Sequence, residues 1–153
     1  MHEYRPRVVL DCMIFLQAAA RRSGACLLLA ELRLLELYVN PAILAEVQDV
    51  ISRPQIRIKF RQLTDDVVAE FIARIERIAI RVDQVGIDII LTRDPKDEPY
   101  LNLAAQSQAH YLVSRDRDLL EGADAIAKTM PNLRIVEPVA FLAVVRAQIG
   151  NNS

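Results

Sequence analysis

Short apolar segments with the character of buried strands alternate with amphipathic helical segments along the whole chain. The expected strands lie at 8–10, 36–39, 111–113 and 133–136, and the apolar segment 87–91 also has extended character. The expected helices lie at 14–22, 25–34, 41–53, 64–79, from the loop 94–99 to 108, and at 138–148. Strands that alternate with helices are joined by crossovers. This order predicts an α/β fold, a three-layer α/β/α sandwich with a mostly parallel central sheet.

The chain has the length of one domain. Its 153 residues can bury a core without disulfides or a structural metal. No internal repeat, low-complexity tract or linker interrupts the pattern. We expect a single domain over 1–149 and a frayed tail over 150–153.

Composition excludes several classes of function. The formal net charge of −1 argues against a non-specific nucleic-acid coat, and the scarcity of aromatic residues argues against a base-stacking sheet. Cys12 and Cys26 belong to no metal-binding array, and without a secretory signal both are expected to be reduced in a cytoplasmic protein. No apolar stretch approaches the roughly 20 residues that span a bilayer, so no membrane association is expected.

Two aspartates follow predicted strands at the end where parallel sheets bind ligands. Asp11 comes directly after the strand 8–10, and Asp116 comes three residues after Val113. Ligands of open α/β sheets bind beyond the carboxyl ends of the strands, near the point where the strand order reverses. Asp11 alone is also consistent with a loop or cap residue, because Asp is common at strand-to-helix turns.

Two further acids belong to predicted helices. Asp97 occupies the cap or first turn of its helix, and Leu101 and Ala104 follow on the same inward face. A simple N-cap is the alternative for Asp97. Glu46 falls about 40° outside the apolar arc of its helix, so it is half turned toward the interior. A boundary glutamate that stays in solvent is the alternative there.

The four acids point to one chemistry if they converge. Carboxylates packed together raise one another's pKa unless a cation neutralises them, and a divalent metal ion is the simplest such cation. Oxygen ligands favour Mg²⁺ or Mn²⁺ over zinc. Such an ion suits phosphodiester cleavage, because it can ionise a water and stabilise the leaving oxygen. The expected catalytic and metal-binding residues are Asp11, Glu46, Asp97 and Asp116.

Five segments, in order along the chain, resemble the motifs of PIN domains. They are Val8–Asp11, Ala45–Val47 with Ile51–Pro54 behind it, Arg93–Asp97 with Tyr100–Ala104, Ala109–Leu120, and Arg134–Leu142. The likeness covers nearly the whole chain. Its closest subgroup is the PIN proteins related to VapC-type toxins of toxin–antitoxin systems.

The resemblance implies an α/β/α fold, a Mg²⁺- or Mn²⁺-dependent endoribonuclease with an RNA substrate, an antitoxin partner and a homo-oligomer. By motif position, it assigns the same four acids to the metal site. Ser114 matches a Ser or Thr that supports the site by hydrogen bonding. Asp118 is a nearby acid that supports the site or only caps a helix.

One position departs from the family pattern. Met13 stands where the family often has Asn, and Cys12 replaces the common Thr. A thioether cannot supply the hydrogen bonds of an amide. A weakened or non-catalytic PIN-fold module that binds RNA or protein is therefore the alternative function.

Basic and apolar segments supply candidate binding surfaces. Four basic residues follow the second motif and are expected either to hold RNA phosphates or to form a solvated helical face: Arg53, Arg57, Lys59 and Arg61. Arg115 and Arg117 flank Asp116 and either touch the substrate or pair with acids. The Leu-rich stretch 27–35 is core, with a dimer face or an antitoxin groove as the alternatives.

Other catalytic classes fit the residues less well. An aspartyl phosphotransferase needs a second acid close behind Asp11, where Cys12 and Met13 stand. His110 precedes a strand and is expected to be structural. Cys12 is expected to be a small buried residue rather than a nucleophile.

Overall fold

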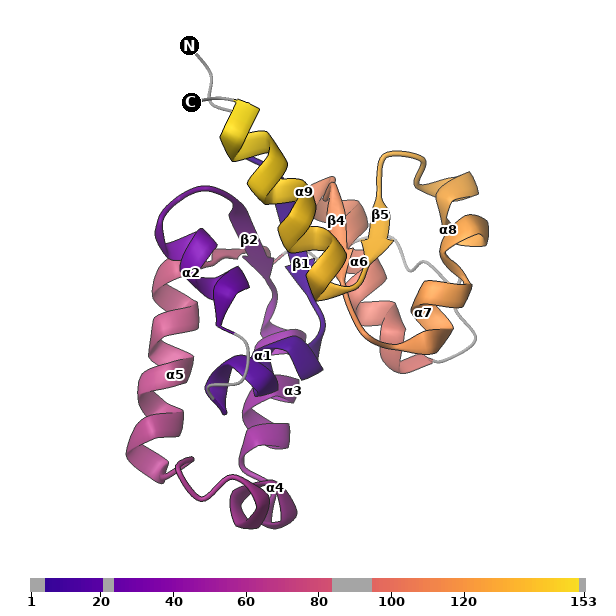
Figure 1. The fold of residues 1–153 in the computed structure, drawn as a ribbon. Coiled ribbons are helices and arrows are strands. Elements are labelled where there is room, and N and C mark those ends of the chain that lie inside the picture. The colour runs from indigo at the N-terminus through magenta and orange to yellow at the C-terminus, as the bar shows by residue number, and fades with distance from the viewer. Residues whose placement is uncertain (1–4, 21–23, 84–94, 152–153) are drawn as a thin grey trace.

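The sheet is parallel throughout the residues that the computed structural model describes, which are 5–20, 24–83 and 95–151 (Figure 1). The strands are β1 Arg7–Leu10, β2 Glu36–Val39, β3 Ile80–Arg81, β4 Tyr111–Val113 and β5 Arg134–Val136. Their order across the sheet is β3-β2-β1-β4-β5. The predicted α/β sandwich with a parallel central sheet is therefore confirmed.

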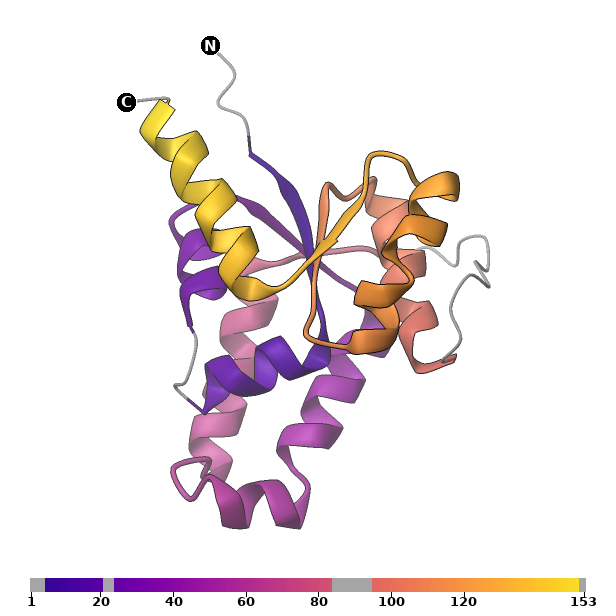
Figure 2. The same cartoon turned by 45° about the vertical axis from the view of Figure 1, so that its right-hand side comes forward.

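Helices cover both faces of this sheet. They are α1 Cys12–Ala19, α2 Ala25–Glu31, α3 Pro41–Ile51, α4 Pro54–Lys59, α5 Asp65–Ile78, α6 Glu98–Ser107 after a 3₁₀ turn at Pro95–Asp97, α7 Arg117–Glu121, α8 Ala123–Thr129 and α9 Pro138–Asn151. α6 contacts β1, β2 and β4, whereas α9 contacts β4 and α2. Figures 1 and 2 show α9 in front of the sheet and α6 behind it, which gives the three layers.

The strand order reverses between β1 and β4. The chain moves from β1 to β2 and β3 on one side, and then returns to the other side of β1 for β4 and β5. Leu10 pairs with Val113, and the Asp11 amide donates to the Val113 carbonyl over 3.0 Å. The residues that directly follow β1 and β4 are therefore neighbours at the point where such sheets bind ligands.

Two predicted helix starts are confirmed. The Asn40 side chain accepts a hydrogen bond from the Ile43 amide over 2.7 Å, with Pro41 at the first helical position of α3. Thr64 accepts from the Val67 amide over 3.3 Å and starts α5. The predicted apolar stripe of α5 supplies buried side chains to the core, namely Val68, Phe71 and Ile75.

Several short elements are not apparent in the sequence pattern. The helix expected over 41–53 ends at Ile51, and Pro54 occupies the first position of a separate short helix, α4. Helices α7 and α8 and the two-residue β3 are too short to display a clear apolar period. The expected extended segment 87–91 lies outside the described residues.

Three further helix boundaries are wrong by two or three residues. α1 begins at Cys12 rather than Ile14, because Asp11 is its N-cap. α2 ends at Glu31 rather than Leu34, and Arg33 has a φ of 60° that a helix cannot accommodate. α9 continues to Asn151, so two residues expected in the frayed tail, 150 and 151, are helical. Within the described ranges, no helix combines the length and the apolar character needed to cross a bilayer.

Candidate active site

A cavity of about 600 Å³ lies at the carboxyl ends of β1 and β4. All four predicted acids line it, and they come from four different segments of the chain: Asp11 after β1, Glu46 in α3, Asp97 before α6 and Asp116 after β4. We call this space the acid cavity. The convergence expected from the sequence is thus present in the fold.

Asp11 is held by two hydrogen bonds. Its Oδ2 accepts from the Ser114 hydroxyl over 2.6 Å, and its Oδ1 accepts weakly from the Met13 amide over 3.5 Å. Burial raises the pKa of the Asp11 carboxyl above its usual value, and the neighbouring carboxylates Asp116 and Glu46 raise it further. The hydrogen bonds from Ser114 and Met13 act in the opposite direction. A nearby cation would relieve the repulsion that the other two acids exert on Asp11.

Ser114 connects two of the acids. It is fully buried, its hydroxyl donates to Asp11, and its Oγ accepts from the Asp116 amide over 2.9 Å. Its own amide donates to the Val136 carbonyl over 3.0 Å, which anchors the loop to the end of β5. Ser114 therefore fixes the distance between the strand ends that carry Asp11 and Asp116.

Glu46 is tied to α6 by a contact that the sequence did not predict. The Tyr100 hydroxyl donates to Glu46 Oε2 over 2.8 Å. Burial is the largest cause that raises the pKa of Tyr100, so the phenol stays protonated and acts as a donor. Tyr100 lies three residues after Asp97, on the same side of α6. The hydrogen bond thus fixes the orientation of Glu46 relative to Asp97.

Asp97 and Asp116 both occupy N-cap positions but differ in their contacts. Asp97 is buried, and its side chain makes no capping hydrogen bond to α6. The Asp116 Oδ1 caps α7 by accepting from the amides of Asp118 and Leu119 over 2.8 and 3.4 Å. The carboxyl of Asp118 is exposed and does not line the acid cavity. An N-cap role therefore accounts for one oxygen of Asp116 and does not account for Asp97.

The comparison with protein families decides the class of this chain. A model described as a PIN domain matches residues 7–118, which is well over half of the sequence and includes all four acids. The chain belongs to the PIN-domain family. PIN domains are generally nucleases. The comparison with curated proteins found no match.

Three cations also line the acid cavity of this PIN domain: Arg53, Lys96 and Arg115. All three residues are exposed, whereas the four acids are buried or half-buried. Arg53 Nη2 forms a 2.9 Å salt bridge with Asp49 on the surface. The cavity therefore has carboxylates deeper inside, which suit a metal ion, and cations at its exposed rim, which suit a phosphate group.

Three residues of the expected phosphate-binding set do not line the acid cavity: Arg57, Lys59 and Arg61. Arg57 donates from Nε to the Ile51 carbonyl and from Nη1 to the Leu63 carbonyl and Asp65, over 2.8 to 3.0 Å. These bonds connect the end of α3 to the start of α5, so Arg57 has a structural role. Arg61 is exposed and does not line the acid cavity. Lys96 and Arg115 take their place beside Arg53 at the rim.

The four carboxylates of the acid cavity suit a cation that prefers oxygen ligands and is bound partly through water. Within the described residues, no three His, Cys, Asp or Glu side chains are close enough to enclose one ion directly. Mg²⁺ usually binds through one or two carboxylates and keeps several of its waters. Four carboxylates around a cavity of this volume suit that mode, with the remaining acids acting through waters. A site in which all four carboxylates bind one ion directly is not supported by the positions of the described residues.

Neither cysteine has the properties of a nucleophile. Both are unpaired and buried. Burial raises the pKa of the Cys12 thiol to about 12 and that of Cys26 to about 11. Because the thiolate is the reactive form, both remain unreactive near neutral pH. Cys12 therefore lines the acid cavity as a small buried side chain.

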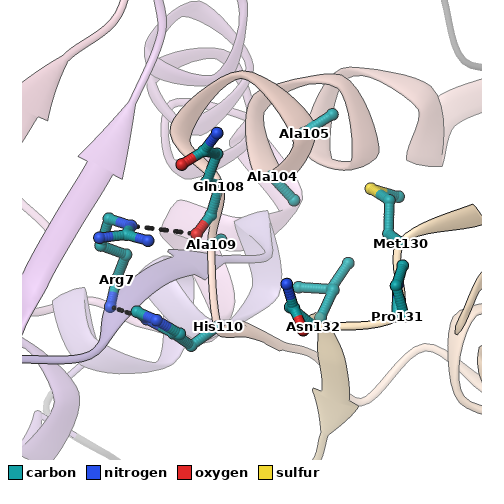
Figure 3. Close-up of a pocket in the computed structure, with 10 residues that line it drawn as sticks. Arg7, Ala104, Ala105, Gln108, Ala109, His110, Met130, Pro131 and Asn132 are labelled. Carbon is teal, nitrogen blue, oxygen red and sulfur yellow. Dashed lines mark hydrogen bonds between the residues drawn. The ribbon is translucent and has the colours of Figure 1, made fainter.

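A cavity of about 560 Å³ lies at the opposite ends of the strands (Figure 3). Arg7 begins β1, and His110 directly precedes β4. His110 Nδ1 accepts from the Arg7 amide over 2.9 Å, and Arg7 Nε donates to the Gln108 carbonyl over 3.0 Å. Burial and the nearby Arg7 lower the pKa of His110. Its hydrogen bond joins the starts of β1 and β4, far from the four acids, which is a structural role.

Proposed function

We propose that this PIN domain is a Mg²⁺- or Mn²⁺-dependent endoribonuclease, with Asp11, Glu46, Asp97 and Asp116 as its catalytic metal-binding acids. The observation that carries the proposal is the convergence of these acids, from four segments, on one cavity at the reversal point of the sheet. Carboxylates that can hold a metal ion, with cations at the rim that can hold phosphate, suit cleavage of a phosphodiester.

Each group of residues has a separate task in this proposal. Asp11 and Asp116, which Ser114 holds at neighbouring strand ends, are the first candidates for direct ligands of the ion. Glu46, oriented by Tyr100, and Asp97 hold the waters around it. When bound, the ion supplies Lewis acidity and a water that ionises near neutral pH. Arg53, Lys96 and Arg115 bind the phosphates and position the chain for attack.

The experiment that tests this function is cleavage of labelled single-stranded RNA of mixed sequence. The purified protein is incubated with Mg²⁺, with Mn²⁺, or with a chelator. Internal cleavage with either ion and none in chelator is the expected result. Cleavage that continues undiminished in chelator would refute the metal mechanism.

Removal of the Ser114 hydroxyl should shift the pH dependence of cleavage. Asp11 must be ionised to bind a cation, so activity is lost as the pH falls through its raised pKa. Ser114→Ala removes a hydrogen bond that lowers this pKa, and the acidic limb should therefore move to higher pH. We expect a loss of about tenfold in rate at neutral pH, the effect of one hydrogen bond to a charged group. The pH profile of kcat/KM measures the shift, and an unmoved acidic limb would exclude this role for Ser114.

We further propose that the domain is the toxin of a toxin–antitoxin pair and that an antitoxin protein binds it. The support is the order of its motifs, which resembles that of VapC-type PIN proteins. Induced expression of the wild-type chain in a bacterial host should arrest growth, and Asp11→Asn should not. Normal growth with soluble, active protein present would argue against a toxin role.

We also propose that the chain forms a homo-oligomer through apolar contacts. Leu28 lies on α2, Leu32 is the C-cap residue one turn later, and they are 51% and 59% exposed. Exposed leucines at this spacing form one apolar face of the helix. Light scattering at micromolar concentration should give a mass above the 17.3 kDa of one chain. A monomer there would contradict the proposal.

A second candidate function rests on Met13. This residue is 47% exposed and lines the acid cavity at the position where the family often has an amide side chain. A weakened or non-catalytic module that binds RNA or protein would result if the missing hydrogen bonds are essential. Such a module would bind single-stranded RNA in a filter assay and cleave none of a broad panel with either metal ion.

A further inference from the structure

A second cavity, of about 470 Å³, adjoins the acid cavity. The two share Met13 and Gln17 of α1 and Arg115 of the loop after β4. The second cavity extends from these shared residues toward α4. We call it the side cavity. A chain that enters the acid cavity can reach the side cavity without leaving the surface of the protein.

The walls of the side cavity differ from those of the acid cavity. Its remaining lining consists of the apolar side chains Leu16, Ile56 and Phe60, together with Lys59. Carboxylates are absent among the described residues that line it. The Lys59 Nζ lies 5.4 Å from the centre of the Phe60 ring. The side cavity therefore combines an apolar wall, including one aromatic ring, with cations.

The two cations of the side cavity, Lys59 and Arg115, differ from the neighbouring arginines in their salt bridges. Arg53 and Arg57, on the same part of the surface, are paired with Asp49 and Asp65. In contrast, within the described part of the chain neither Lys59 nor Arg115 forms a salt bridge. Their positive charge is available to an anion that approaches the boundary between the two cavities.

Gln17 adds a polar group between the cavities. Its Oε1 is buried and has no hydrogen-bond partner among the described residues. A buried acceptor without a donor is costly, and a ligand donor relieves that cost after a small rotation of the side chain. The carbonyl accepts from an N–H or O–H, and the amide nitrogen at the other end donates. Gln17 can therefore bond to the edge of a nucleobase or to a ribose hydroxyl.

We propose that the side cavity binds the unpaired nucleobase of an RNA nucleotide next to the cleaved phosphate. This inference rests on the proposed nuclease function. The base packs against Ile56 and Phe60, and Lys59 and Arg115 hold the adjoining phosphate. Base contacts of this kind, with an aromatic ring and a flanking cation, are typical of proteins that bind single strands. A base within a duplex cannot enter, so the side cavity selects single-stranded RNA.

The first test measures binding without catalysis. Isotope-labelled protein, free of metal, is titrated with adenosine or uridine 5′-monophosphate and followed by amide chemical shifts. We expect shifts at Met13, Gln17 and Phe60. Lys59→Ala should weaken binding about tenfold, which is the effect of one charge-assisted hydrogen bond to phosphate. Arg61→Ala is the matched control, because it removes the same charge from an exposed position that lines neither cavity.

The second test uses cleavage of RNA with a single abasic nucleotide, moved in turn to each position around the cleaved bond. At one adjacent position the missing base should lower kcat/KM for the wild type. Phe60→Leu, which keeps an apolar side chain, should lower kcat/KM for intact RNA and make the protein insensitive to the abasic substitution. Thermal melting verifies that each variant is folded.

The outcomes separate this inference from the nuclease function. RNA cleavage with no effect of any abasic position, and no nucleotide shifts at the side cavity, would overturn the inference and leave the nuclease standing. Nucleotide shifts at the side cavity in a protein that cleaves no RNA would support the binding site and overturn the nuclease. Equal weakening by Lys59→Ala and Arg61→Ala would reduce the effect to general charge and would also overturn the inference.

Discussion

Asp11→Asn should reduce cleavage of RNA about a thousandfold, since catalytic metals contribute several kcal/mol of charge stabilisation and each tenfold in rate is about 1.4 kcal/mol. The amide keeps the shape of the side chain and removes the charge that attracts the cation. Asp11 is the acid whose position is best determined, because β1 ends at Leu10 and Ser114 holds its Oδ2. Initial rates with Mg²⁺ or Mn²⁺ measure the loss, with wild-type protein purified in parallel.

The same variant should not lose stability. The pKa of Asp11 is raised in the folded protein, so folding favours its protonated form, and the ionised form is destabilising above that pKa. The neutral amide removes this cost at pH 7. Without metal, the melting temperature of Asp11→Asn should equal or exceed that of the wild type. A large drop in melting temperature would mean that lost activity reflects unfolding. Full activity in protein free of contaminating nuclease would exclude Asp11 from the chemistry.

The acids that follow β1 and β4, Asp11 and Asp116, could be located from the sequence because ligand sites at the carboxyl ends of parallel strands are a general property of α/β sheets. A short apolar run followed by Asp places the carboxylate at the carboxyl end of a parallel strand, which holds for Asp11. The position of Glu46 on its helix gave a weaker signal, because a boundary residue can turn either way. It became informative only together with the other acids.

The contacts that refine the site depend on packing that no local pattern contains. Tyr100 reaches Glu46 across 54 positions of sequence because α3 and α6 lie against each other. Arg57 looked equivalent to Lys59 in a basic run, yet from α4 its guanidinium donates to the Ile51 carbonyl at the end of α3 and to the Leu63 carbonyl just before α5. Lys96 lines the cavity beside Asp97, its neighbour in the chain. Contacts between elements that are far apart in the chain could not be predicted from the sequence pattern alone.

Glu46→Gln should cause the second largest loss, about a hundredfold in cleavage rate, because it removes a charge from the same cavity while keeping a group that can hold a water. Tyr100→Phe should cost only about tenfold, since it leaves the charge in place and removes the hydrogen bond that orients it. Both rates are measured at saturating Mg²⁺ and Mn²⁺. Glu70→Gln, which removes the same charge from an exposed position on α5, is the control and should be neutral.

The double variant determines whether Tyr100 acts through Glu46. If the Tyr100 hydroxyl serves only to orient that carboxylate, adding Tyr100→Phe to Glu46→Gln should cause little further loss in rate. The two single effects would then be strongly non-additive, as expected for side chains in direct contact. Losses that multiply would instead assign Tyr100 an independent contact with substrate. Wild-type activity in Glu46→Gln alone, with Asp11→Asn inactive, would return Glu46 to the role of a boundary glutamate and leave three acids at the site.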